Sequence, residues 1–216
     1  MHWNPPSTPP PQRICYIAQS LNAEGISVKT PRALDLFSGQ GSWRDAFLLM
    51  GYDVVTMDKS PRFHPQICCD ILKWKYWEDF KPGDFEVISA SVPCEHYSTA
   101  RSTSPRNLPR ANRIVRKTLE IIAYLKPKKW LIENPRYGLL RDQPFMKNLD
   151  FVDVDYCQFS DYGYKKPTRI WGGPEIKNIP PSFAIRKPVE IVSMEEIYVG
   201  GIVYGWADMV TNPPQL

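Results

Sequence analysis

The chain has 216 residues, 43% of them hydrophobic and 12% aromatic, which suits one soluble globular domain and leaves too little chain for two large ones. No apolar run is long enough to span a membrane and no basic-then-apolar leader opens the chain, so we expect a cytoplasmic or nuclear protein that is neither secreted nor attached to a membrane. Five cysteines without a CxxC spacing and only three histidines exclude a zinc framework, so we expect free thiols in a reducing compartment and no metal.

Strands and helices alternate along most of the chain. Residues 1–11 are rich in proline and predict an extended arm, and apolar residues at helical spacing predict a helix at residues 12–25. We expect strands at residues 31–37, 52–58, 85–91, 128–135, 151–159 and 167–173, and helices at residues 42–51 and 109–125. One more strand is expected at residues 197–204. The alternation predicts an α/β fold with a mostly parallel sheet flanked by helices.

A glycine turn, ALDLFSGQGSW, joins the first strand to the first helix of this pattern. A lone G-x-G is often only a tight connection, and the third glycine of a dinucleotide fingerprint is replaced by Arg44. Large side chains at Trp43 and Arg44 suit a cradled pyrophosphate poorly. A nucleoside without phosphate fits better, which favours S-adenosylmethionine as the ligand.

Two acidic residues follow at positions suited to such a nucleoside. Asp58 closes the second strand and can accept hydrogen bonds from the ribose hydroxyls, unless it only caps the following helix. Asp70 can accept from the adenine amino group with Ile71 packing on the ring, unless it is a surface-turn acid.

The stretch SVPCEHYSTARS follows a buried strand and places Cys94 at the carboxyl edge of the sheet, where open α/β folds keep their chemistry. A cysteine there is most often a small buried hydrophobe. The sequence IENP ends the next strand, however, so Glu133 is expected beside the thiol. A thiolate and a carboxyl together favour nucleophilic catalysis with proton transfer.

Positive charge is concentrated immediately after this stretch. Residues 101–117 carry six basic side chains and no acidic one, while the rest of the chain has 21 basic and 23 acidic residues. The segment suits a phosphate clamp, although a solvated helix face would have the same pattern. Candidate nucleic-acid contacts are Ser98, Arg101, Arg106, Arg110, Arg113, Lys117, Lys165 and Lys166.

Four motifs in order, DLFSGQGS, VPCEHYS, IENP and DYGYKKPTR, resemble those of the cytosine-C5 DNA methyltransferases, particularly short phage-type members. The resemblance covers residues 33–171. It implies a Rossmann-like, S-adenosylmethionine-dependent methyltransferase fold, with a single domain over 1–216 and a reduced C-terminal region over 172–216. The cofactor residues it implies, with their neighbours, are Phe37, Ser38, Gly39, Gly41, Ser42, Asp58, Lys59, Asp70, Ile71 and Pro93.

The resemblance also implies the chemistry, which is methyl transfer to C5 of cytosine in DNA through a covalent bond between Cys94 and C6. Glu133 would grip the base at N3 in protonated or proton-sharing form, and Arg169 would offset charge at O2. Basic residues after Cys94, beginning with Arg101, would lower the pKa of its thiol. His96 is one candidate for the base that removes the C5 proton, with a structural role as the alternative.

Several positions depart from the family pattern. Glu95 stands where glutamine is usual, Pro167 replaces the first arginine of the arginine strand, and no Gly-Asn-Ser motif follows. Only 45 residues follow Trp171, so we expect no large target-recognition domain. We expect the helix at Gln12–Ala23 to close the cofactor pocket instead.

The substrate is therefore less determined than the chemistry. Duplex DNA would require base flipping. Single-stranded DNA, RNA, a free pyrimidine nucleotide or a partner protein that supplies specificity are alternatives, as is a catalytically silent nucleic-acid-binding module. The oligomeric state is left open.

Overall fold

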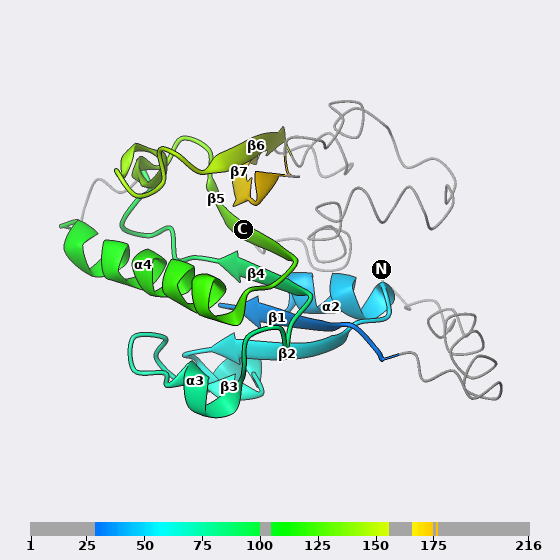
Figure 1. Cartoon of the computed structure of the whole chain (residues 1–216). Coiled ribbons are helices and arrows are strands. Elements are labelled where there is room, and N and C mark those ends of the chain that lie inside the picture. Colours follow the sequence, from blue (N-terminus) through cyan, green and yellow to red (C-terminus); the bar gives the residue numbers. More distant parts are fainter. Residues whose placement is uncertain (1–28, 100–104, 156–165, 175, 177–216) are drawn as a thin grey trace, which may run out of the picture.

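The computed structural model describes residues 29–99, 105–155, 166–174 and 176, and its centre is a seven-stranded sheet (Figure 1). The strands lie in the order β3-β2-β1-β4-β5-β7-β6. Their bounds are Arg32–Leu36 (β1), Asp53–Asp58 (β2), Ile67–Cys68 (β3), Val87–Ser91 (β4), Lys129–Pro135 (β5), Asp150–Asp155 (β6) and Pro167–Gly172 (β7). Strands β1 to β5 pair in parallel, whereas β7 runs antiparallel to both β5 and β6. The predicted Rossmann-like, mostly parallel sheet is confirmed.

Three α-helices flank the sheet in the described residues: α2 (Ser42–Leu49), α3 (Tyr76–Asp79) and α4 (Leu108–Leu125). Helices α2 and α4 match the predicted ones, and Asn107 caps α4 by accepting a hydrogen bond from the Arg110 backbone N–H. The short elements β3 and α3 were not predicted, because two to four residues carry no measurable periodicity. The elements expected at residues 12–25 and 197–204 lie outside the described residues. No helix in the described ranges is both long and apolar enough to cross a membrane.

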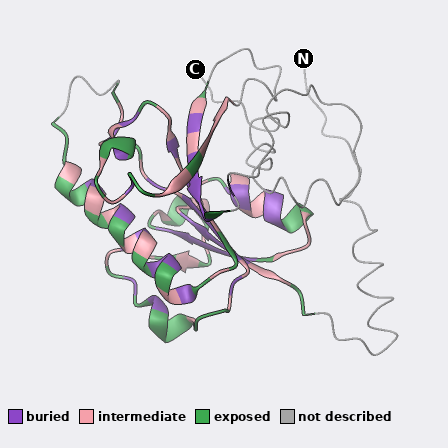
Figure 2. Ribbon diagram, turned by 45° about the horizontal axis from the view of Figure 1, so that its top comes forward, coloured by how far each residue is buried: buried purple, intermediate pink, exposed green. Residues whose placement is uncertain are grey.

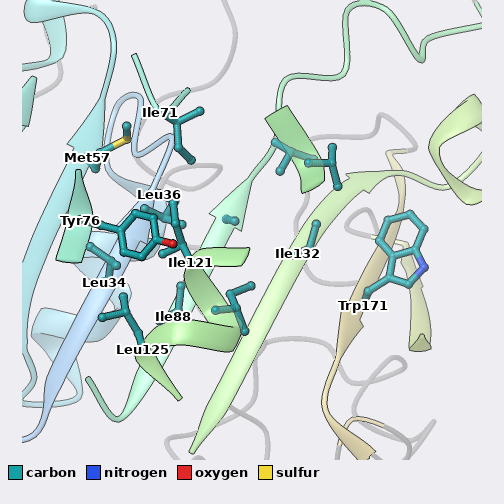
Figure 3. Packing of buried hydrophobic residues seen from close by; sticks show 14 of the residues in the cluster. Leu34, Leu36, Met57, Ile71, Tyr76, Ile88, Ile121, Leu125, Ile132 and Trp171 are labelled. Atoms are coloured by element: carbon teal, nitrogen blue, oxygen red, sulfur yellow. The ribbon is translucent and has the colours of Figure 1, made fainter. Parts of the chain in front are cut away.

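Side chains alternate between the two faces of the sheet, and each face has its own core. Figure 2 marks the buried stretches of the strands and helices, and Figure 3 shows side chains of the core that includes Leu34 and Trp171. One face, here the α4 face, packs Leu34, Ile88, Ile132 and Trp171 against Ile121 and Leu125 of α4. The other, the α2 face, packs Ala33, Val87, Leu131 and Ile170 against Trp43 and Phe47 of α2. The face on which a residue lies follows from its parity along the strand.

The α2 face also carries a row of polar residues near the carboxyl ends of the strands. Counting in steps of two from its core residues gives Asp35 in β1, Asp58 in β2, Ser89 and Ser91 in β4, and Glu133 in β5. The carboxyl ends of parallel strands share one edge of a sheet, where open α/β folds bind their ligands. The fold therefore gathers these polar side chains on one face of one edge.

Candidate active site

The glycine turn after β1 has a left-handed backbone at three positions. Phe37, Gly39 and Gly41 have φ values of 59°, 50° and 97°. The turn is closed by hydrogen bonds from the Ser38 backbone N–H to the Met57 carbonyl at 3.1 Å and from the Gly41 N–H to the Ser38 carbonyl at 2.7 Å. A left-handed phenylalanine is unusual and marks a backbone held in place by its surroundings. Both features fit a turn built for close approach of a ligand.

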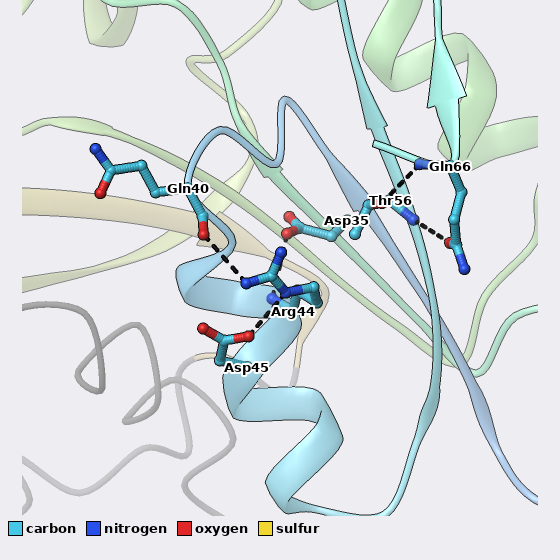
Figure 4. A network of polar contacts seen from close by, with 6 residues as sticks. All are labelled: Asp35, Gln40, Arg44, Asp45, Thr56 and Gln66. Atoms are coloured by element: carbon cyan, nitrogen blue, oxygen red, sulfur yellow. Dashed lines mark hydrogen bonds and ion pairs between the residues drawn. The ribbon is translucent and has the colours of Figure 1, made fainter. Parts of the chain in front are cut away.

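Arg44 folds back over this turn (Figure 4). Its guanidinium donates to the Gln40 carbonyl at 3.2 Å and to the Asp45 carboxylate at 2.7 Å. A Cβ on Gly41 would meet that guanidinium, which is the movable end of a flexible side chain, so it is the φ of 97° that favours glycine there. Arg44 thus covers the start of α2, whose first residue is Ser42, where a pyrophosphate lies in dinucleotide-binding folds.

Asp35 is a buried acid beneath the turn. It accepts hydrogen bonds from the Ser89 hydroxyl at 3.0 Å and from the Arg44 backbone N–H at 3.2 Å. Its side chain lies among buried residues, and this burial raises its pKa to about 7 despite the two donors. Asp35 ties β1, β4 and α2 together below the turn.

Asp58 is buried and bridges two loops. One carboxylate oxygen accepts from the Gly39 backbone N–H at 3.0 Å and the other from the Ser60 N–H at 2.8 Å, just before the 3-10 helix Pro61–Phe63. Asp58 does not cap this helix, whose N-cap is Ser60 without a side-chain cap bond, and its carboxylate lies directly beside the glycine turn. Lys59, next to it, is exposed.

The residues expected around the adenine differ in their exposure. Asp70 is half-buried and accepts from the Leu72 backbone N–H at 3.0 Å, as a turn-forming acid does. Ile71 is only 3% exposed and belongs to the core of the α4 face, so it offers little surface to a ring.

Cys94 lies in a tight turn directly after β4 and half-buried Pro93. Its carbonyl accepts hydrogen bonds from the backbone N–H groups of both Tyr97 and Ser98, each at 2.9 Å. The residue as a whole is exposed, yet partial burial of the thiol raises its pKa above the ordinary value. Glu133 and Glu95 also raise the pKa, whereas Lys166 lowers it. The expected depression of this pKa is thus not present in the chain without ligand, and Arg101 lies outside the described residues.

Buried hydrogen bonds hold this turn from below. Tyr97 is fully buried, and its hydroxyl donates to the Asn112 side chain of α4 at 2.8 Å. Asn112 donates in turn to Gln143 at 2.8 Å, and the Leu139 backbone N–H donates to the Tyr97 carbonyl at 2.9 Å. Residues 92–98, called the nucleophile loop after the role expected of Cys94, are thereby connected to two separate elements, α4 and the 3-10 helix Leu139–Asp142.

His96 has a structural role in the same turn. Its Nδ1 accepts from the Asn107 backbone N–H at 3.2 Å, which in the neutral ring leaves the proton on Nε2, 3.5 Å from the Glu95 carboxylate. The imidazole links the nucleophile loop to the start of α4, so the structure favours the structural alternative over the base.

Glu133 at the end of β5 faces the same space as Cys94. Its carboxylate accepts from the Ser91 hydroxyl at 3.1 Å and lies 3.8 Å from the Lys166 ammonium. Its side chain is 17% exposed. Ser91 and Lys166 were not predicted in these roles, although the two-residue spacing from Ser89 placed Ser91 on this face.

Arg169 is directed away from Glu133. In the antiparallel register Arg169 pairs with Asn134, and Glu133 pairs with Ile170, so Arg169 lies on the α4 face. There it forms a bidentate ion pair with Asp153 at 2.7 and 2.8 Å. Arg169 therefore does not face Glu133, as joint contact with one cytosine at O2 and N3 would require, because neighbouring residues of a strand point to opposite faces.

Asn134 is a positioning residue that sequence reasoning missed. It is 2% exposed, and its amide donates to the Val92 carbonyl at 2.9 Å, one peptide before Pro93 and Cys94. Its Oδ1 is buried and has no hydrogen-bond partner within the part of the chain that the structure describes. The end of β5 therefore fixes the path of the chain into the nucleophile loop.

The basic segment is only partly available to a phosphate. Arg110 and Arg113 are exposed on α4. Arg106 donates to the Ser98 carbonyl at 2.9 Å. Lys117 was expected to point outward, but its side chain is 16% exposed, 2.8 Å from Glu120 and packed over the Tyr76 and Trp77 rings. Arg101 and Lys165 lie outside the described residues.

Within the described residues, no cluster of acidic, histidine and cysteine side chains could hold a metal ion.

Comparison with known proteins shows the family to which the chain is related. The family model for the C-5 cytosine-specific DNA methylases matches residues 32–170. A Frog virus 3 (isolate Goorha) protein named "Probable DNA (cytosine-5)-methyltransferase" is 36% identical over 157 residues, which are 65% of this chain and 69% of that protein.

Two solved structures share the fold. A prophage-encoded E. coli protein assigned as a DNA modification methyltransferase gives a TM-score of 0.52 at 18% identity over 78% of this chain and 55% of its own. The S. pombe Dnmt2 methyltransferase gives 0.50 at 18% identity over 67% and 49%. The chain thus spans about half the length of these structures. By its motifs, sheet and family match, the chain belongs to the C-5 cytosine-specific DNA methylase family.

Proposed function

We propose that the protein transfers a methyl group from S-adenosylmethionine to C5 of cytosine in DNA through a covalent bond between Cys94 and C6. The observation that carries the proposal is the placement of Cys94 beside Glu133 at the carboxyl edge of the sheet, on the face that carries Asp58. Family membership supports the same reaction.

The residues of the glycine turn fit the methyl donor. Gly39 and Gly41 have positive φ values and carry no Cβ, which leaves room for a ligand at these two positions, and Asp58 adds an acceptor for ribose hydroxyls next to the turn. Phe37, Ser38, Ser42, Lys59, Asp70 and Pro93 complete the proposed cofactor set. When bound, S-adenosylmethionine supplies an electrophilic methyl group.

Cys94 acts first as a nucleophile. Its sulfur forms a bond to C6, the C5–C6 π electrons shift through the ring, and N3 gains electron density. A proton shared between N3 and Glu133 stabilises this developing charge. C5 then becomes enamine-like and accepts the methyl group. Loss of the C5 proton to a base releases the sulfur from C6 and restores the aromatic ring. Ser91 orients Glu133 throughout, because its hydroxyl donates to the carboxylate.

The raised pKa of Cys94 leaves little thiolate at neutral pH in the chain without ligand. Binding must therefore lower it, and the positive sulfonium of the methyl donor supplies suitable charge. A silent nucleic-acid-binding module is the rival function that the same raised pKa and Glu95 favour.

A substrate panel tests the proposal. The full chain and Cys94→Ala are incubated with methyl-labelled S-adenosylmethionine and duplex DNA, single-stranded DNA, RNA or dCMP. We expect label in DNA cytosine with the wild-type chain and none with Cys94→Ala. Label confined to RNA or dCMP would make that molecule the substrate in place of DNA. Label transferred by Cys94→Ala would contradict the covalent step, and no label on any substrate would favour the silent module.

A further inference from the structure

We propose that Lys166, and not Arg169, is the cation that stabilises the Cys94 thiolate and contacts O2 of the cytosine in this active site. The proposal rests on the function proposed above and assigns a residue to it. Its starting point is the register of β7 against β5, which decides which basic side chain of the KKPTR segment faces Glu133.

The register turns Arg169 to the far face. Arg169 stands opposite Asn134 in β5 and opposite Asp153 in β6, and both lie on the α4 face. Its guanidinium is satisfied there by the bidentate pair with Asp153 and by stacking 3.7 Å over the Phe151 ring. To reach Glu133 it would have to leave both partners and cross the plane of the sheet.

Lys166 lies just before β7 and on the Glu133 side. Its ammonium is 3.8 Å from the Glu133 carboxylate, and its side chain is 47% exposed, which leaves it accessible to a bound base. Among the charged groups that act on Cys94, Glu133 from β5 and Glu95 from the nucleophile loop disfavour the thiolate, and Lys166 favours it. His96 faces Glu95 at 3.5 Å.

This placement defines what Lys166 can do in the reaction. Before attack, its positive charge stabilises the sulfur as a thiolate. When the S–C6 bond forms and the π electrons shift toward N3 and O2, the same ammonium can donate a hydrogen bond to O2 while Glu133 meets N3. Lys166 keeps its proton throughout, so no further reactant is required. It also offsets Glu95, whose charge opposes the thiolate.

The test compares Lys166→Met, Lys166→Arg and Arg169→Met with the wild-type full chain, and Lys128→Met serves as a matched control. Lys128 is 75% exposed and pairs with Glu86 before the start of β5, at the opposite end of the strands. The first readout is the pH dependence of iodoacetamide alkylation of Cys94, followed by mass spectrometry of its peptide. The second is kcat and KM for DNA with labelled S-adenosylmethionine.

We expect Lys166→Met to move the alkylation midpoint to higher pH and to lower kcat by about 100-fold with KM changed less than about threefold. Lys166→Arg should restore most of both, and Arg169→Met and Lys128→Met should leave the alkylation profile unchanged. A wild-type profile in Lys166→Met with a raised KM would make Lys166 a phosphate contact only, and a shifted profile in Arg169→Met would return the role to Arg169; either result overturns the proposal. If the wild-type chain transfers no methyl group, the proposed function fails, and the alkylation comparison alone still decides whether Lys166 controls the thiol.

Discussion

Where β5 ends and β7 begins, each face of the sheet carries a carboxylate with a basic side chain near it, but the two pairs differ in their contacts. On the α2 face, the carboxylate of Glu133 has one hydroxyl donor and a lysine 3.8 Å away. On the α4 face, Asp153 is held by the bidentate pair with Arg169 and by Arg136 at 3.1 Å. The first arrangement leaves hydrogen-bonding capacity for a ligand, whereas the second satisfies its charges internally. The comparison agrees with the proposal that the α2 face carries the chemistry, whereas the ion pairs of the α4 face join β5, β6 and β7.

Glu133→Gln should show the largest effect on activity, and an unchanged activity would contradict the difference drawn between the two faces. Glutamine keeps the shape and can still accept from Ser91, but it carries no exchangeable acid proton. We expect kcat to fall by about 10²- to 10³-fold with little change in melting temperature. Glu86→Gln, at the other end of the sheet beside Lys128, is the control and should keep full activity. Activity of Glu133→Gln within a few fold of wild type would remove the acid from the mechanism.

Asp153→Asn tests the opposite face. The substitution leaves two guanidinium groups without their carboxylate in a site where the Arg169 side chain is 14% exposed. We expect unfolding free energy to fall by about 2–3 kcal/mol, measured by denaturant titration, with kcat retained in the folded protein. The control Asp142→Asn, whose carboxylate is 59% exposed beside Arg141, should cost less than about 0.5 kcal/mol. A large loss of kcat at unchanged stability would instead place the α4 face in the chemistry.

Asp35→Asn should change the pH dependence of stability. Because burial raises the pKa of Asp35 from its ordinary value of 3.8 to about 7, the native state binds more protons than the unfolded state between these values. The wild-type protein therefore loses stability as pH rises from about 4 to about 7, and this loss is absent in the asparagine variant. We expect the free energy of unfolding of the variant, relative to that of the wild type, to rise by about 1–3 kcal/mol between pH 4.5 and pH 8. Parallel stability curves would show that the buried carboxyl ionises without cost.

Tyr97→Phe should give the smallest effect. It removes the buried hydrogen bond to Asn112 and leaves that amide partly unsatisfied, so we expect a loss of about 1 kcal/mol, or about 2–4 °C in melting temperature. Tyr137→Phe, at a site 55% exposed, is the control and should leave the melting temperature unchanged. A larger loss for Tyr97→Phe, together with faster alkylation of Cys94, would show that this bond holds the nucleophile loop closed.

Much of the fold could be predicted from the sequence because its signals are local. The alternating apolar strands, the glycine turn and the capped helix α4 each depend on residues close together in the chain. The same locality placed Cys94 and Glu133 at the ends of adjacent parallel strands. Ser91 and Asn134 were missed, because hydrogen bonds from one strand end to another depend on register rather than on spacing within a motif.

The basic residues show most clearly where sequence reasoning stops. Lys117 has the helical spacing of a solvent-facing residue, yet it packs on aromatic rings contributed by α3. That helix is too short for its position to be predicted from periodicity, so its contact with α4 could not be anticipated.

By itself, the sequence determined the sheet, the turn and the positions of the proposed nucleophile and its acid, since each lies in a contiguous pattern. Only the tertiary structure decided which cation accompanies them. The side-chain period of a strand is two, so a shift of one residue in the pairing of β7 with β5 would exchange the faces of its side chains. The observed register puts Arg169 with Asp153 and leaves Lys166 beside Glu133, and the chemistry of the site follows from that pairing.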